Sequence, residues 1–382
     1  MKKILISLIL IITVTVSGIF SLSASAYNIN EYEMHHKAGM LISMDTGDVL
    51  YEKNADEKIY PASITKLMTA LIMVENIPDL ENTKIPYTWD AHQRILGTGS
   101  VVLNLKVGEE ITAKDALAAL LIPSCGDVAY AIAEYVGGTT ENFVDMMNKR
   151  ALELGMNNTS FKNACGLEAE GHFTSARDIA IMSRELIVNH PEIKEYSTIW
   201  MDYIIHKTSR GESRFDLANT NKFLKQYSGA TGLKTGYTSQ AKYCMSATAE
   251  RNGVELIAVI MGADTKEIRN SEAGRLLDYG FSTCEIYTDT AVLPENLSFN
   301  VKYGVKDITI YNAVEEKQIS IISYGAPLGV SAGLYRAYQT APEFRFPFIK
   351  PNPEKFNPDA FITSKMQIFS GMRSRAAWHA LR

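Results

Sequence analysis

The sequence has few cysteines and lacks the spacings that bind metal ions. Its 382 residues include Cys125, Cys165, Cys244 and Cys284, with no Cys-x-x-Cys pair and no close group of histidines and cysteines. Zinc sites are usually built from such groups, so we expect neither a metal site nor another cofactor. Four cysteines allow three disulfide pairings, and the sequence does not choose among them. Because a chain of this length builds a core without disulfides, we expect free, mostly buried thiols.

Positive charge is not in excess either. The chain has 38 Lys and Arg against 43 Asp and Glu, a formal net charge of −5. Proteins that bind nucleic acids usually carry a basic footprint, so nucleic acid is not an expected partner. No internal repeat is visible. With 46% hydrophobic and 21% charged residues, the composition is that of a globular protein.

The N-terminus has the pattern of an export signal. Lys2 and Lys3 precede an apolar run that ends near residue 20, and the small-residue stretch SLSASA follows. This pattern predicts a signal peptide over residues 1–26, cut after Ala26, with an uncleaved membrane anchor as the alternative. In both cases we expect the remainder outside the cytoplasm, either secreted or on the outer face of the cytoplasmic membrane.

Strands are predicted at both ends of residues 27–284, and helices between them. Residues 38–56 predict a hairpin, and residues 234–263 predict two long strands that meet at Asn252-Gly253. The economical arrangement is an α/β domain in which both chain ends form one sheet and the helical middle packs on it. Apolar spacing and stop signals predict helices beginning near residue 63 and over residues 112–122, 127–138, 140–155, 175–190 and 271–281.

The pattern changes after about residue 282. Alternating residues predict short strands, and hence a small β-rich domain over residues 290–360, although the chain is irregular and Pro-rich beyond residue 325. Residues 361–382 combine apolar residues at helical spacing with several arginines. This segment is either an amphipathic helix at a membrane surface or a helix or tail that belongs to its own domain.

Ser63 and Lys66 form the first candidate catalytic pair. Three residues apart on a helix, the two side chains share one face. The serine would lie in the first turn, where free backbone N–H groups favour a developing oxyanion. A serine hydroxyl needs a base to become a nucleophile, and a lysine acts as that base only when burial or a nearby cation lowers its pKa. The alternative is an N-cap serine beside a surface lysine.

Lys234, Thr235 and Gly236 form the second candidate group, at the start of the first long strand. A lysine on an edge strand would lower the pKa of Lys66 and attract a carboxylate, which the threonine hydroxyl would bind. The glycine would let a substrate backbone approach the strand closely. The alternative is an ordinary turn.

The two motifs together, about 170 residues apart, are the combination found in serine β-lactamases and penicillin-binding proteins. Longer stretches, namely residues 60–75, 133–163, 171–182 and 232–263, closely resemble the D-alanyl-D-alanine carboxypeptidases, the serine-type penicillin-binding proteins of low molecular mass. The resemblance runs from about residue 30 to residue 283. It implies a penicillin-recognising, β-lactamase-like domain with an antiparallel sheet flanked by helices.

The resemblance also implies an activity, which is removal of the terminal D-alanine from peptidoglycan stem pentapeptides through an acyl-enzyme. Ser63 would be the acylated nucleophile and Lys66 its general base, and β-lactams would acylate the same serine as inhibitors. The backbone N–H groups of Ser63 and Tyr237 would form the oxyanion hole. Arg269 matches an arginine that orients the substrate's terminal carboxylate, a role that suits its bidentate donors; the alternative is a surface residue at a helix start.

The family's second motif, Ser-x-Asn, falls on Ser124, Cys125 and Gly126. Ser124 matches and would join the proton network between the two lysines, whereas Gly126 has no side chain to replace the amide. Losing one or two hydrogen bonds to a neutral group costs about 1–3 kcal/mol, or roughly 5- to 150-fold in rate. Gly126→Asn is therefore expected to raise activity. Ser124 and Asp127 also form a capping-box pattern, which predicts that Ser124 caps the next helix.

Two other functions compete with the carboxypeptidase. One is a β-lactamase or transpeptidase of the same fold, which efficient penicillin hydrolysis would indicate. The other is a catalytically impaired relative that only binds peptidoglycan or penicillin, which Gly126 favours.

Overall fold

The structure is a computed structural model that describes residues 33–208, 211–289, 292–293, 311–312 and 319–324. The predicted signal peptide and the predicted helix over residues 361–382 lie outside the described residues. Most of the predicted β-rich domain over residues 290–360 lies outside them as well, so its extent stays a prediction.

A five-stranded antiparallel sheet forms the centre of the described chain, in the order β2-β1-β9-β8-β7. The chain's two ends meet in it, because β1 pairs with β9 along its whole length. The prediction of one sheet built from both ends is therefore confirmed. Strand β7, which carries the Lys-Thr-Gly motif, lies at the edge. The strands are β1 (Ala38–Ser43), β2 (Val49–Lys53), β7 (Ala230–Thr238), β8 (Lys242–Arg251) and β9 (Val254–Ala263).

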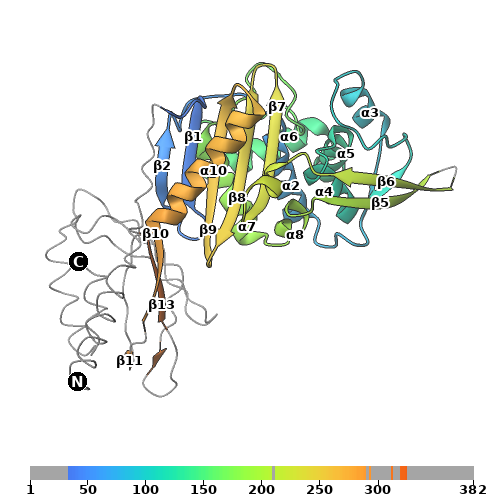
Figure 1. Cartoon of the computed structure of the whole chain (residues 1–382). Helices are drawn as coiled ribbons and strands as arrows, with labels where there is room; N and C mark the ends of the chain where they lie inside the picture. Colours follow the sequence, from blue (N-terminus) through green and yellow to red (C-terminus); the bar gives the residue numbers. More distant parts are fainter. Residues whose placement is uncertain (1–32, 209–210, 290–291, 294–310, 313–318, 325–382) are drawn as a thin grey trace, which may run out of the picture.

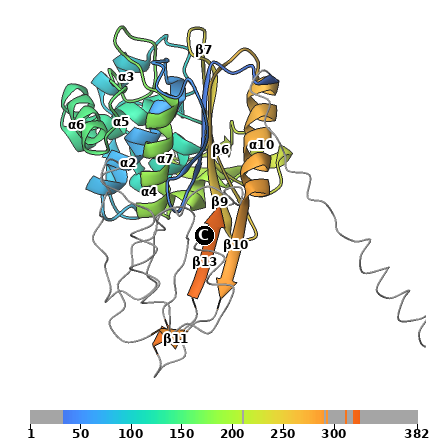
Figure 2. The ribbon, with the colours of Figure 1, turned by 90° about the vertical axis from the view of Figure 1, so that its left-hand side faces the viewer.

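Helices cover both faces of this sheet (Figures 1 and 2). Helix α10 (Lys266–Thr283) packs on one face, and most of the helical middle of the chain packs on the other. The predicted helices are all present, although their ends shift by a few residues. On the second face the longer helices are α2 (Lys66–Asn76), α4 (Ala113–Leu121), α5 (Gly126–Gly137), α6 (Thr140–Glu153) and α7 (Ala176–Asn189).

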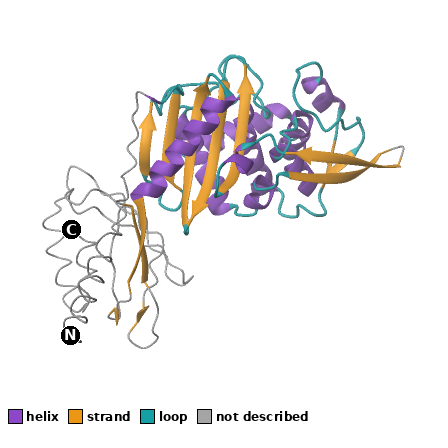
Figure 3. Ribbon diagram, viewed as in Figure 1, coloured by secondary structure: helices purple, strands orange, loops and turns teal. Residues whose placement is uncertain are grey.

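Several further elements lie outside the main sheet and the longer helices. A hairpin of β5 (Met201–Thr208) and β6 (Gly211–Ala218) projects from the helical side (Figure 3). Strands β10 (Cys284–Asp289) and β13 (Ile319–Tyr324) pair beyond the main sheet. The other short elements are β3 (Lys84–Pro86), β4 (Glu110–Thr112), β11 (Val292–Leu293), β12 (Tyr311–Asn312), the 3₁₀ turn η2 (Ala62–Thr65), α3 (Trp89–Ile95), α8 (Ile193–Ser197) and α9 (Phe223–Gln226). Of these elements, β12 and β13 fall where short strands were predicted.

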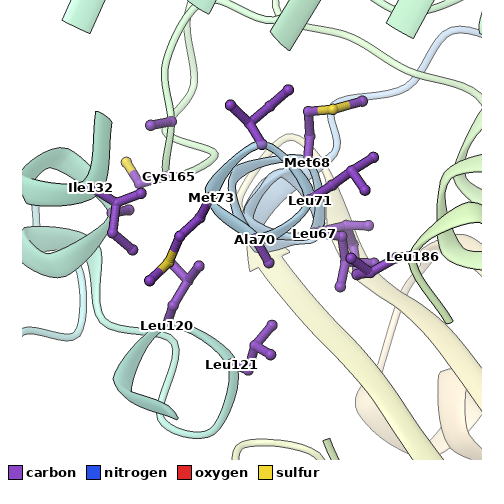
Figure 4. Close-up of a cluster of buried hydrophobic side chains, with 14 of the residues drawn as sticks. Leu67, Met68, Ala70, Leu71, Met73, Leu120, Leu121, Ile132, Cys165 and Leu186 are labelled. Carbon is purple, nitrogen blue, oxygen red and sulfur yellow. The ribbon is translucent and has the colours of Figure 1, made fainter. Parts of the chain in front are cut away.

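Helix α2 runs through the core of the helical layer (Figure 4). Its residues 66–73 are all buried, so apolar neighbours surround it rather than line one face. Leu67 and Leu71 are fully buried, and each such side chain contributes about 1.5–3 kcal/mol. The first turn of α2, where Lys66 lies, is thereby held rigidly. Within the described residues, no helix is long and apolar enough to cross a membrane. All four cysteines are free and buried, as predicted.

Candidate active site

Ser63 and Lys66 lie together at the point where η2 passes into α2. The Lys66 Nζ lies 3.2 Å from the Ser63 Oγ and donates to the Cys165 carbonyl at 2.7 Å. Lys66 is 2% exposed, and burial lowers the pKa of its amine. A neutral amine keeps a lone pair that accepts the serine proton. The predicted base is therefore buried next to the predicted nucleophile, and the alternative of a surface lysine is wrong.

Lys234 approaches the same place from strand β7. It is 1% exposed, and its Nζ donates to the Thr235 carbonyl at 3.3 Å. Burial lowers the pKa of Lys234 well below its ordinary value, and the positive charge of Lys66 lowers it further. Two buried amines whose pKa values are both lowered, with the charge of Lys66 among the causes for Lys234, resist carrying two protons at once. This pair is suited to passing a proton.

Gly236 determines how closely β7 approaches the turn that carries Ser63. A Cβ at this position would lie 3.0 Å from both the Ser63 backbone nitrogen and the Ala62 Cβ. The missing side chain lets the strand run directly alongside Ser63. The ring of the next residue, Tyr237, lies against that of Tyr243, with the centroids 4.4 Å apart and the planes tilted by 34°. The strand edge therefore stays open in front of the serine.

Ser124 lies between α4 and α5 and faces the same cavity as Ser63. Its φ is +72°, an uncommon value for a residue with a side chain, and such strain is often found at functional sites. Its Oγ is buried and has no hydrogen-bond partner in the described part of the chain. A buried hydroxyl without a partner costs stability, so this one is available to a substrate or to a transferring proton.

The predicted capping role of Ser124 is wrong. Helix α5 begins at Gly126 with Cys125 at its N-cap, and no side chain caps it. The Asp127 carboxylate does not reach back to Ser124 but accepts from the backbone N–H groups of Leu103 and Asn104, both at 3.0 Å. Asp127 is 1% exposed, and burial raises its pKa. The capping-box spacing is present, but a longer-range contact uses the carboxylate.

The space beside Gly126 is occupied. A Cβ there would lie 2.7 Å from the Ile95 Cδ1 and 3.1 Å from the Ser100 Cβ. The Gly126 N–H donates to the Val101 carbonyl at 2.7 Å, which holds this loop against α5. The chain has therefore filled the position where an asparagine side chain would begin.

A cavity of about 770 Å³ opens in front of these groups. Arg269 lies in its wall, 6% exposed, with its Nε donating to the Asn270 Oδ1 at 2.9 Å. It forms no ion pair with a described residue, and burial lowers the pKa of its guanidinium. The alternative of a surface residue at the helix start is therefore wrong, and the role of Arg269 in orienting a carboxylate stays a prediction. Predicted residues in the cavity wall are Ser63, Ser124, Thr235, Gly236, Tyr237 and Arg269.

The loop over residues 163–167 also belongs to the site, and sequence reasoning missed it. The Asn163 Oδ1 accepts from the N–H groups of Gly166 at 2.7 Å and Leu167 at 3.1 Å, which shapes the loop. The Thr69 hydroxyl donates to the Ala164 carbonyl at 2.6 Å. The loop therefore aims the Cys165 carbonyl at Lys66.

His172 fixes the other end of this loop. Its Nδ1 accepts from the Lys162 N–H at 2.8 Å, so its Nε2 carries the proton and donates to the Thr65 Oγ1 at 3.0 Å. Burial lowers the pKa of His172 to about 4. The residue next to Lys66 is thus tied to a neutral, buried imidazole more than 100 positions later. A helix-start pattern gave no signal for this contact.

Known proteins share this chain's sequence and fold. The family model described as D-alanyl-D-alanine carboxypeptidase matches residues 24–265. The D-alanyl-D-alanine carboxypeptidase DacF of Bacillus subtilis is 41% identical over 66% of this chain, which spans 63% of the length of that relative. DacC of Escherichia coli, with the same description, is 33% identical over 82% of this chain and 77% of its own. The crystal structure of penicillin binding protein 6B from Escherichia coli is 28% identical, with a TM-score of 0.63 over 78% of this chain and 86% of that one.

Proposed function

This chain belongs to the family of D-alanyl-D-alanine carboxypeptidases, and we propose that it removes the terminal D-alanine from peptidoglycan stem pentapeptides. The observation that carries the proposal is the contact between the Ser63 Oγ and the buried Lys66 Nζ at 3.2 Å. A serine beside a low-pKa amine, at the start of a helix and open to a cavity, is an activated nucleophile.

Acylation begins when the Ser63 Oγ attacks the carbonyl carbon of the penultimate D-alanine. Its proton passes to the Lys66 Nζ, and the oxygen of the tetrahedral intermediate takes the negative charge. The N–H groups of Ser63 and Tyr237 would stabilise this charge, because Gly236 brings the strand against the turn. The carbon–nitrogen bond then breaks, and D-alanine leaves with a proton on its amine.

The proton for the leaving amine would travel through Ser124. Its hydroxyl has no partner among the described residues and faces the same cavity as Ser63. The lowered pKa values of Lys66 and Lys234 allow either amine to give up a proton to this hydroxyl. Water then attacks the acyl-enzyme, with Lys66 again as the base, and frees the shortened peptide and the serine.

Recognition of the terminal carboxylate would fall to Arg269 and Thr235. Arg269 is a buried cation without an ion-pair partner in the described chain. A carboxylate that entered the cavity would supply that partner. The Thr235 hydroxyl lies 3.0 Å from that of Thr220 and faces the same cavity. This arrangement favours substrates that end in a free carboxylate, which β-lactams also carry next to their reactive carbonyl.

We place this reaction outside the cytoplasm, where peptidoglycan lies. The predicted signal peptide over residues 1–26 would export the chain, and the segment over residues 361–382 would hold it at the membrane surface. Removing residues 361–382 should move the protein from the membrane fraction to the soluble fraction of lysed cells. An unchanged distribution would contradict the membrane role and leave the enzymatic proposal intact.

Mass spectrometry after incubation with penicillin tests the enzymatic proposal. We expect one covalent adduct per chain, on Ser63, and none in Ser63→Ala. Release of D-alanine from a D-Ala-D-Ala peptide should be lost in the same variant. Rapid loss of the adduct with release of hydrolysed penicillin would favour a β-lactamase instead. An adduct without D-alanine release would favour an impaired binding relative.

A further inference from the structure

The hairpin of β5 and β6 has a free edge along β6. The Asn219 N–H donates to the Trp200 carbonyl at 3.0 Å, and the two strands continue in this register to their turn. In an antiparallel pair, alternate residues point their backbone N–H and C=O groups toward the partner strand and away from it. These groups therefore point away from β5 at residues 212, 214, 216 and 218. No described residue bonds to them, so this edge is able to accept a further strand.

Buried side chains fix the hairpin on the body of the protein and leave this edge exposed. Ile204 and Leu217 belong to the main core, and Phe215 packs against it. Exposed residues alternate with them along β6, at Glu212, Arg214, Asp216 and Ala218. The hairpin also projects beyond the helices around it (Figure 3). Because the core already holds β6, a strand that paired with it would not first have to order it.

Two opposite charges lie at the middle of this edge. The Arg214 Nε donates to the Asp216 carboxylate at 2.8 Å, and the guanidinium lies over the Tyr203 ring. The side chains of Arg214 and Asp216 are 61% and 66% exposed. The remaining N–H groups of the guanidinium have no partner among the described residues, so they are able to bind a second carboxylate.

The order of the charges makes the edge complementary to a second copy of itself. If two copies of β6 met antiparallel about a two-fold axis at Phe215, Arg214 of each would lie opposite Asp216 of the other. The outward-pointing backbone groups would then face each other as well. An axis at Arg214 or Asp216 would place like charges directly opposite each other, which is unfavourable. An axis at Ser213 would pair Glu212 with Arg214, but over the shorter stretch of residues 211–215.

We infer that this protein forms a symmetric homodimer in which the β6 strands of two copies pair edge to edge. The two hairpins would join into one antiparallel sheet in the order β5-β6-β6-β5. The two Phe215 rings would lie next to each other at the axis, on the side of this sheet that faces the core. A second copy is the partner because the charges along the edge complement their own reverse. The inference is independent of the chemistry proposed for Ser63.

The molar mass of the full chain, measured by light scattering, tests the inference. A single pair of strands makes a small interface, so we expect a weak dimer that forms as the concentration rises from about 1 to about 500 µM. Arg214→Asp would place two carboxylates opposite each other at both symmetric positions, and Asp216→Arg would do the same with two guanidinium groups. Each variant should raise the dissociation constant of the dimer by about tenfold or more, because attractive pairs become repulsive.

Mixing the two variants gives the sharpest test. In a pair made of one Arg214→Asp chain and one Asp216→Arg chain, opposite charges again lie opposite each other at both positions. The mixture should therefore dimerise about as tightly as the parent, although each variant alone dimerises more weakly. Misfolding of either variant would not produce this rescue. The double variant Arg214→Asp/Asp216→Arg should dimerise like the parent for the same reason.

Lys37→Asp is the matched control. Lys37 also forms an exposed ion pair, with Glu57 at 2.8 Å, but it lies next to β1, across the main sheet from the hairpin (Figure 1). This variant makes the same change of charge as Arg214→Asp and should keep the dissociation constant of the parent. A parent that stays monomeric at about 500 µM would show that the charges only protect the edge, and would overturn the inference. A dimer that is unchanged in both single variants, or a mixture without rescue, would overturn it too.

Discussion

The two walls of the site are built in different ways. The strand wall, Lys234 to Tyr237 of β7, is short, regular and held by the sheet, and Gly236 brings it to Ser63. The loop wall, Ser124 to Asp127, has a residue at positive φ and is held by contacts to residues 101–104. The strand wall matches its sequence motif residue by residue. The loop wall keeps the serine but fills the asparagine position with neighbouring side chains.

This difference shows which features a short motif determines. The position of the strand wall depends only on how β7 passes the turn that carries Ser63, so the four residues from Lys234 to Tyr237 are enough to specify it. Where the geometry depends on a loop packed by distant residues, a change at one position is absorbed by others, here by Ile95 and Ser100. Variants that disturb each wall separately should therefore give effects of different size.

Lys66 lies between the two walls, and its replacement should have the largest effect. Lys66→Arg keeps a positive charge but cannot accept a proton, because the guanidinium pKa stays above about 12. We expect acylation by a fluorescent penicillin to slow by about 10²- to 10⁴-fold, the usual contribution of a general base. Lys66→Met should be equally slow. Lys106→Met, at an exposed position, should acylate at the parent rate.

If Lys66→Arg acylated at the parent rate, the base would have to be another group. The comparison of the two variants matters because Met removes the charge and Arg does not. A loss in Met alone would mean that Lys66 acts through its charge.

Gly236→Ala tests the strand wall. The added Cβ would press on the Ser63 nitrogen and the Ala62 Cβ, so strand and turn must separate by a few tenths of an ångström. Misplacing one oxyanion donor costs about 10²- to 10³-fold in kcat. We expect a loss of about 10²-fold in kcat with little change in KM. Thermal unfolding should stay close to that of the parent, and a large drop in Tm would indicate a folding defect instead.

His172 tests the contacts behind Lys66 through pH. Above about pH 6.5 the imidazole is neutral in both the folded and the unfolded chain. As pH falls from 6.5 to about 4, only the unfolded chain binds the proton, so the free energy of unfolding decreases, and below pH 4 the decrease stops. The shift corresponds to a total of about 3 kcal/mol. Urea unfolding across this range measures it.

His172→Gln should remove this part of the pH dependence. Whatever its stability at pH 7, the variant should lose about 3 kcal/mol less than the parent between pH 6.5 and pH 4. Parallel curves for parent and variant would show that the pKa of His172 is the same in the folded and the unfolded chain, and so is not lowered by burial.

Sequence patterns were enough for the features that depend on near neighbours. The alternation around Asn252-Gly253 predicted the β8–β9 hairpin, and apolar spacing predicted α2 and α7. These signals lie within each element's own sequence, whether one face is buried, as in α7, or all sides are, as in residues 66–73 of α2. The pair of Ser63 and Lys66 followed from helix geometry. These predictions needed no knowledge of distant residues.

The remaining features depend on contacts between distant residues. The Cys165 carbonyl lies 99 residues from Lys66 along the chain, and Ala164 lies 95 residues from Thr69. Asp127 was predicted to complete a capping box, but it accepts hydrogen bonds from Leu103 and Asn104 instead. A local sequence pattern shows which hydrogen bonds a side chain is able to form. Packing against distant residues determines which of them it does form.

Gly126→Asn tests the loop wall and should have the smallest effect. The sequence alone predicts a gain in activity, but a Cβ at this position would lie 2.7 Å from the Ile95 Cδ1. The single variant should therefore gain little, because the new side chain must first displace Ile95. Ile95→Val removes that methyl group, at a cost of about 0.5–1.5 kcal/mol of stability.

The double variant Gly126→Asn/Ile95→Val should accept the amide side chain without this contact. We expect its kcat/KM on a D-Ala-D-Ala peptide to exceed that of Ile95→Val alone by about tenfold, within the range for one or two restored hydrogen bonds. Steady-state release of D-alanine by the four proteins gives the comparison. A gain in the single variant as large as in the double would mean that the Ile95 side chain moves aside at little cost. No gain in either variant would mean that another group of the loop wall already supplies the missing hydrogen bond. The hydroxyl of Ser100 lies nearby, so Ser100 would then be the first residue to substitute.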